Sequence, residues 1–187
     1  MDVPPPLYFI AIIPPEPVHS FAQNQKEYFS YRFNSKAALR SPPHITLHMP
    51  FRLKEKKEEM LIKKLKTVAS DHEPFELDVN GFGNFEPRVI YLDITKPEKL
   101  AALQTNVGKI MRQEMNLLNA NYKDQVFNPH LTVAFRDLKK TMFYRAWEEF
   151  KDKEYHVSFN VTNFSLLRHD GSKWRVYEAF QLHKKNG

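Results

Sequence analysis

The sequence contains no cysteine, which excludes disulfides and thiolate metal ligands and favours a reducing compartment. It also lacks a long apolar run, because the segment from Leu7 to Ile13 has only seven residues and ends at Pro14, whereas a membrane span needs about 20. The same segment follows the acidic Asp2 and has no small-residue cleavage site, so it does not resemble a signal peptide. We therefore expect a cytoplasmic, monomeric protein with no membrane partner.

Metal-binding motifs are also missing from the sequence. There is no H-E-x-x-H segment and no group of carboxylates at the spacing of a metal site. We expect neither a metal nor another cofactor.

The composition favours one globular domain with an anionic partner. A chain of 187 residues with 42% hydrophobic and 13% aromatic residues can bury a substantial core. The 28 Lys+Arg residues exceed the 22 Asp+Glu residues and give a formal charge of +6. An excess of positive charge favours partners such as RNA or a nucleotide.

Hydrophobic periodicity and turn residues predict an alternation of strands and helices. Each half of the chain contains a strand–helix–strand unit, and several connections are short enough for hairpins. We therefore expect one α+β domain over residues 1–187, with two pseudo-symmetric lobes of largely antiparallel sheet, outer helices and a central cleft. The expected strands are 7–13, 44–51, 75–80, 88–94, 128–135, 155–168 and 174–182, the helices are 17–33, 54–70, 95–116 and 140–150, and residues 81–84 are expected to form a turn.

One short pattern occurs twice, as PPHITL at 42–47 and as NPHLTV at 128–133. Residues i and i+2 of a strand point to the same face. His44 and Thr46 therefore share one face of the first strand, and His130 and Thr132 share one face of the second. If these two strands face each other, their groove contains two imidazoles and two hydroxyls.

This set of side chains suits the hydrolysis of a phosphodiester. Imidazole has a pKa of about 6.5, so one histidine can accept a proton while the other donates one. The threonine hydroxyls can donate hydrogen bonds to the phosphate oxygens. A zinc site formed by His44, His48 and His130 is the alternative use of the same residues.

The two motifs resemble the twin H-x-[ST]-x signatures of the 2H phosphoesterase superfamily, and within it the bacterial RNA 2′,3′-cyclic phosphodiesterase (2′-5′ RNA ligase-like) branch. The resemblance covers nearly the whole chain. It implies a bilobed fold with a metal-free cleft in which His44, Thr46, His130 and Thr132 are catalytic. The implied substrate is a 2′,3′-cyclic phosphate on an RNA or nucleotide end, which is typically opened to a 2′-phosphate. Some members of the family also perform the reverse reaction, which joins RNA ends.

The second motif departs from the pattern of this branch, which often places arginine five residues after the histidine. Phe135 occupies that position here, and Arg136 follows it. In a regular strand this shift turns Arg136 to the opposite face unless a bulge restores the register, so ligation is not expected.

Four residues are candidates for substrate binding. Arg136 and Arg40 could bind phosphate, Phe127 could stack on a base, and His48 lies in register with His44 and Thr46 if the strand is regular. Of Tyr8 and Phe9, at most one can face the groove, because neighbours on a strand point to opposite faces. We expect the remaining histidines, His19, His72, His156, His169 and His183, at the surface.

Two other functions remain open. The chain could be a non-catalytic RNA- or nucleotide-binding domain, or it could hydrolyse another small cyclic phosphate. The sequence also leaves open which histidine is the acid and which the base, because the two motifs are alike.

Overall fold

The computed structural model describes residues 4–117 and 126–183. The elements in chain order are β1 (Leu7–Ile12), α1 (Val18–Phe33), the 3₁₀ turn η1 (Ala37–Arg40), β2 (Ile45–Arg52), the 3₁₀ turn η2 (Glu55–Lys57), α2 (Glu58–Ser70), β3 (Phe75–Phe85), β4 (Val89–Ile94), α3 (Glu98–Gln113), β5 (His130–Ala134), α4 (Lys140–Phe150), β6 (His156–Val161), β7 (Asn163–His169) and β8 (Trp174–Gln181). None of the helices within these described ranges is long and apolar enough to cross a membrane.

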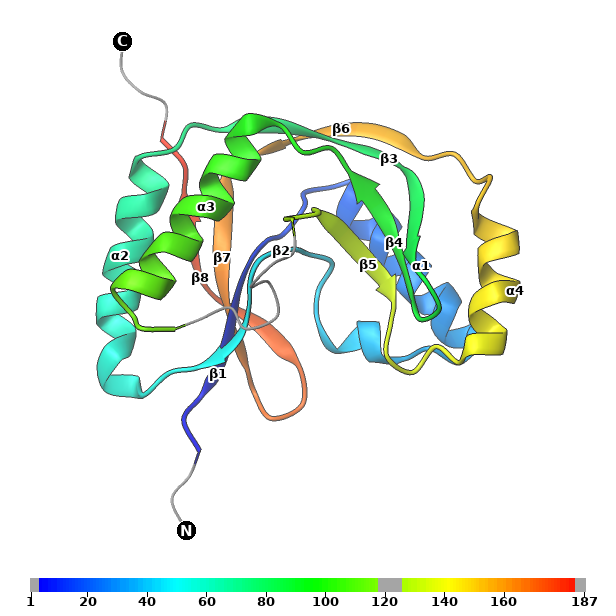
Figure 1. Cartoon of the computed structure of the whole chain (residues 1–187), viewed down its shortest axis with the longest axis horizontal. Coiled ribbons are helices and arrows are strands. Elements are labelled where there is room, and N and C mark those ends of the chain that lie inside the picture. The colour runs from blue at the N-terminus through cyan, green and yellow to red at the C-terminus, as the bar shows by residue number, and fades with distance from the viewer. Residues whose placement is uncertain (1–3, 118–125, 184–187) are drawn as a thin grey trace.

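The strands form one curled antiparallel sheet in the order β6-β3-β4-β5-β2-β1-β7-β8 (Figure 1). Each half of this order contains four strands, and the halves meet where Ile45 of β2 pairs with Leu131 of β5. A pseudo-twofold axis at this seam relates β2 to β5 and β1 to β4. The expected α+β fold with two pseudo-symmetric lobes is therefore confirmed, and the two lobes share one continuous sheet.

Two of the helices, α1 and α3, pack on the half of the sheet opposite to the one whose strands they connect. Helix α1 joins β1 to β2 but contacts β5, and α3 joins β4 to β5 but contacts β2. Figure 1 shows α2 and α3 together beside one half of the sheet, with α1 and α4 beside the other. These packed faces belong to one hydrophobic core cluster, in which Ile45 and Leu131 are fully buried. The sheet is therefore held across its seam by helices from both halves.

The turn expected at residues 81–84 is wrong. Strand β3 continues through this segment to Phe85. Gly81 has φ +71°, and the β3–β4 register shifts between Val79 and Phe82, so the glycine supports a bulge rather than a reversal. The chain turns at residues 86–88 instead, which places Phe85 at the tip of the hairpin.

The single strand expected at residues 155–168 is also wrong, because the structure divides it at Thr162. Strand β6 pairs with β3 at one end of the sheet, and β7 pairs with β1 in the other half. The chain thus crosses between the halves at this point. The hairpin expected at Asp170 and Gly171 is confirmed, since β7 and β8 pair on either side of these residues.

Candidate active site

A cleft with a volume of about 610 Å³ lies over the seam between β2 and β5. His44, Thr46, His130 and Thr132 all line it. The antiparallel pair of Ile45 and Leu131 places Thr46 opposite His130 and His44 opposite Thr132. The structure therefore brings both halves of the duplicated motif into one groove, as the alternation of side chains predicts.

Both imidazoles are oriented by the same backbone contact. The Nδ1–H group of His44 donates to the carbonyl oxygen of Pro42 at 2.8 Å, and that of His130 donates to the carbonyl of Asn128 at 2.8 Å. A carbonyl oxygen can only accept, so Nδ1 carries the proton in each ring. The Nε2 atom is then left as the exchangeable site of each histidine. The residue before each histidine is a proline, whose restricted φ helps to fix the backbone at this point.

Burial lowers the pKa of both histidines. The imidazole of His44 keeps part of its surface open to the cleft but is otherwise surrounded by protein, and its pKa falls to about 3. Burial is the main cause, and the positive charge of Lys26 adds to it. Burial also lowers the pKa of His130, while its hydrogen bond to Asn128 and the negative charge of Asp93 act in the opposite direction.

Aromatic rings flank the two imidazoles. Phe9 lies 4.8 Å from His44 and 4.6 Å from Trp174, measured between ring centroids. Phe85 lies 5.0 Å from His130. Phe9 lines the cleft and Tyr8 is fully buried in the core, which agrees with the expectation that only one of them faces the groove.

Two of the four candidate substrate-binding residues, Arg40 and Arg136, line the cleft. Strand β5 ends at Ala134, and Arg136 has φ +59°, so the strand alternation that would turn it away no longer applies. Phe135 lines the same cleft. Phe127 is not among the cleft-lining residues and packs against the hydrophobic core instead.

The expectation that His48 shares a face with His44 is wrong. Ala11 pairs with Thr46, but the next β1 residue, Ile10, pairs with His48, so β2 contains one extra residue at this point. This bulge turns His48 inward to 1% exposure, where its Nδ1–H donates to the carbonyl of Met49 at 2.9 Å. His48 does not line the cleft, and within the described ranges no three His, Asp or Glu residues form a group able to hold a metal.

Several cleft residues were not recognised from the sequence, and His169, Trp174 and Lys26 are among them. His169, expected at the surface, lines the cleft beside Trp174. Both come from the β7–β8 hairpin, and no local motif links that hairpin to the histidine strands. Lys26 also lines the cleft, and its signal was present in the sequence: it occupies a buried position of α1 together with Ala22 and Phe29.

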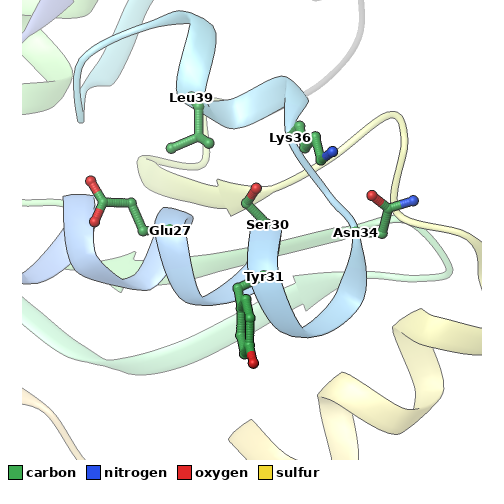
Figure 2. Close-up of a pocket in the computed structure, with 6 residues that line it drawn as sticks. All are labelled: Glu27, Ser30, Tyr31, Asn34, Lys36 and Leu39. Carbon is green, nitrogen blue, oxygen red and sulfur yellow. The ribbon is translucent and has the colours of Figure 1, made fainter.

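A second, shallower depression of about 450 Å³ lies at the C-terminal end of α1 (Figure 2). Its lining residues include Tyr31 and Lys36 but neither copy of the duplicated motif. Tyr31 is 91% exposed, so this depression is an open part of the surface. The cleft over the β2–β5 seam is therefore the candidate active site.

Comparisons with known proteins show the family of this chain. The family model described as "2'-5' RNA ligase superfamily" matches residues 14–173. A Geobacillus kaustophilus protein described as "Putative phosphoesterase" is 31% identical over 176 residues, which cover 92% of this chain and 94% of that protein. A Bacillus cytotoxicus protein of the same description is 32% identical over 147 residues, covering 76% of this chain and 80% of that protein. The chain therefore belongs to the 2′-5′ RNA ligase superfamily of 2H phosphoesterases.

Solved structures share the fold. TT0787 of Thermus thermophilus matches with a TM-score of 0.64 at 20% identity, covering 96% of this chain and 100% of that one. E. coli LigT complexed with 3′-AMP matches with a TM-score of 0.61 at 18% identity, covering 96% and 99% of the two chains. The curled antiparallel sheet with its outer helices is thus a fold that this chain shares with these two proteins.

Proposed function

We propose that this protein is a metal-independent phosphodiesterase that opens 2′,3′-cyclic phosphates at RNA or nucleotide ends. The observation that carries the proposal is the paired geometry of His44 and His130. Each ring is held through Nδ1 by a backbone carbonyl, which leaves two Nε2 atoms for proton transfer in one groove. A diester needs one group that accepts a proton and one that donates a proton, and this pair supplies both.

The proposed reaction adds one water across one phosphorus–oxygen bond. One Nε2 takes a proton from water as the water oxygen bonds to phosphorus, and the other Nε2–H gives its proton to the departing ribose 3′ oxygen. The P–O3′ bond breaks, and the phosphate stays on the 2′ oxygen as a monoester. Thr46 and Thr132 donate hydrogen bonds to the non-bridging oxygens, on which negative charge grows. Proton exchange with solvent then restores the two histidines.

The surroundings of the histidines suit a nucleotide end. Lys26, Arg40 and Arg136 place positive charges around the cleft, where they can attract phosphates. Phe85, which is 39% exposed at the rim, offers a ring face on which a base can stack. Structures of E. coli LigT complexed with 3′-AMP and with ATP support a nucleotide ligand for this fold.

The test is an assay without added metal and with EDTA, using three kinds of substrate: cyclic-ended oligoribonucleotides, 2′,3′-cyclic mononucleotides and non-nucleotide cyclic phosphates. We expect the first two to be opened to 2′-monoesters at an unchanged rate in the chelator. Chromatographic separation of the 2′- and 3′-phosphates measures the outcome. Because the chain is basic, the oligonucleotide should bind more tightly than the mononucleotide, and this advantage should shrink as salt increases.

Other outcomes would replace the proposal. Turnover of only a non-nucleotide cyclic phosphate would identify a different small-molecule hydrolase. RNA binding without turnover of any substrate would favour a non-catalytic binding domain. Activity that is lost in EDTA and restored by zinc would require a metal mechanism instead.

A further inference from the structure

Lys26 makes the two otherwise similar halves of the cleft chemically different. It is 1% exposed on helix α1, and its Nζ donates to the carbonyl oxygen of Ser41 at 3.0 Å. In the equivalent helix of the other half, α3, the buried residues are Leu100, Leu103, Val107 and Met111. A lysine thus occupies a buried position of one helix, while its counterpart buries only apolar side chains.

Packing alone does not explain this lysine. An ammonium group offers three donors, and Ser41 is the one acceptor that Lys26 has within the described ranges. Across those same ranges no carboxylate lies within ion-pair distance of Nζ. Burial without a counter-charge lowers the pKa of Lys26 to about 7. The side chain lines the cleft, so its remaining donors suit an anion bound there.

The charge acts unequally on the two histidines. Lys26 disfavours the protonated form of His44, while Asp93, which pairs with His130 in the β4–β5 register, favours the protonated form of His130. The other charged or titratable side chains that line the cleft are Arg40, Arg136, Asp137 and His169. The carboxylate of Asp137 already accepts hydrogen bonds from Ser35 Oγ and from the backbone N–H groups of residues 36 and 37.

We propose that Lys26 binds the substrate phosphate and, through its place beside His44, makes His44 the general base and His130 the general acid. This proposal rests on the proposed function and adds the assignment that the duplicated motif leaves open. His44 Nε2 takes the proton of the attacking water, and His130 Nε2–H protonates the departing 3′ oxygen. Lys26 donates hydrogen bonds to a non-bridging oxygen and keeps its own proton throughout.

Binding of inorganic sulfate tests the anion site without any turnover. Sulfate resembles phosphate but does not titrate between pH 6 and 9, so calorimetry at constant ionic strength reports the protein groups alone. Burial lowers the pKa of both catalytic histidines, so among these three groups Lys26, with a pKa of about 7, is the one expected to lose its proton between pH 7 and 9. We expect sulfate affinity of the unaltered protein to fall with increasing pH in this interval, by up to about tenfold per unit.

The variant Lys26→Met removes the charge and keeps a side chain of similar length. We expect sulfate affinity at pH 6.5 to be at least about tenfold weaker and nearly independent of pH. Lys36→Met is the matched control, because Lys36 is an exposed lysine in the separate depression of Figure 2. Replacing a buried, unpaired charge by an apolar group should not lower the melting temperature, which checks that the variant folds.

The acid–base assignment has its own readout in the same variant. With a 2′,3′-cyclic nucleotide, loss of the Lys26 charge should raise the pKa of His44 and move the acidic limb of the kcat/KM profile to higher pH. An acidic limb that does not move overturns the assignment. Sulfate affinity that is unchanged in Lys26→Met, or that is flat between pH 7 and 9 in the unaltered protein, overturns the anion site. If sulfate binds as expected but no cyclic phosphate is hydrolysed, the proposed function fails and the anion site stands.

Discussion

Replacing either His44 or His130 with alanine is expected to lower kcat/KM for a 2′,3′-cyclic phosphate by about 10²–10⁴-fold. Each substitution removes one of the two Nε2 atoms that face the cleft, so either the incoming water or the departing oxygen loses its proton partner. Initial rates over a range of substrate concentrations give kcat and KM separately. The loss should fall mainly on kcat, because proton transfer contributes most in the transition state.

The double variant and a control sharpen this prediction. When two groups act as one catalytic unit, the rate losses caused by replacing each of them do not add. The double variant should therefore be only slightly less active than the less active of the two single variants. His156→Ala is the matched control, since His156 is exposed at the start of β6 and is not among the residues lining the cleft. Retention of more than about a fifth of the activity in either single variant would contradict the paired role.

Removing a hydroxyl from the cleft is the second large effect. Thr46→Val and Thr132→Val keep the shape of the side chain but remove the O–H donor, and each should lower kcat by about 10²–10³-fold. The register places Thr46 opposite His130 and Thr132 opposite His44, so each hydroxyl can reach a non-bridging oxygen of a phosphate held between the histidines.

The serine variants provide the control for these two positions. Thr46→Ser and Thr132→Ser keep the hydroxyl and lose only a methyl group, so we expect their rates to remain within about tenfold of the unaltered protein. Equal losses in the valine and serine variants of one position would show that the methyl group matters there and that the hydroxyl does not. Thermal melts of all four variants would separate a packing defect from a catalytic one.

The sequence predicts the centre of the site well because that centre depends on local geometry. His44 and Thr46 lie two residues apart on a strand, as do His130 and Thr132, and the pleat alone places each pair on one face. The apolar residues between them, Ile45 and Leu131, pair at the seam and are fully buried. The sequence therefore predicts the shared face of each pair, and the structure adds that the two strands are neighbours in one sheet.

The periphery of the site depends on irregular backbone, which alternation cannot predict. A bulge in β2 turns His48 into the core, and the end of β5 at Ala134 leaves Arg136 beside the cleft. The bulge at Gly81 lets β3 continue as far as Phe85, which brings an aromatic ring to His130. In each case a local irregularity of the backbone decides where a side chain points, and the pattern of the sequence remains compatible with both outcomes.

The remaining cleft residues depend on long-range strand pairing, which the local sequence pattern does not predict. His169 and Trp174 reach the cleft because the chain crosses between sheet halves at Thr162, where no glycine or proline interrupts the run of strand-forming residues. Lys26 is different, since its helix was predicted correctly and its position is visible in the spacing from Ala22 to Phe29. A charged residue within a buried stripe of a helix is therefore a signal that sequence reading can use.

The pH dependence of kcat/KM for a 2′,3′-cyclic nucleotide, measured in EDTA, tests the two-histidine mechanism most directly. The base must be neutral and the acid protonated, so the profile should be bell-shaped, with apparent pKa values that belong to the pair. Burial lowers the pKa of both His44 and His130. As the pH increases, the histidine that acts as the acid therefore loses its proton at a lower pH than a free imidazole does. The maximum of the profile should lie below about pH 6.5. The phosphate charge favours protonated imidazole, so the maximum of kcat should lie at higher pH than that of kcat/KM. A profile that increases steadily from pH 5 to 8, or one that disappears in the chelator, would contradict the account.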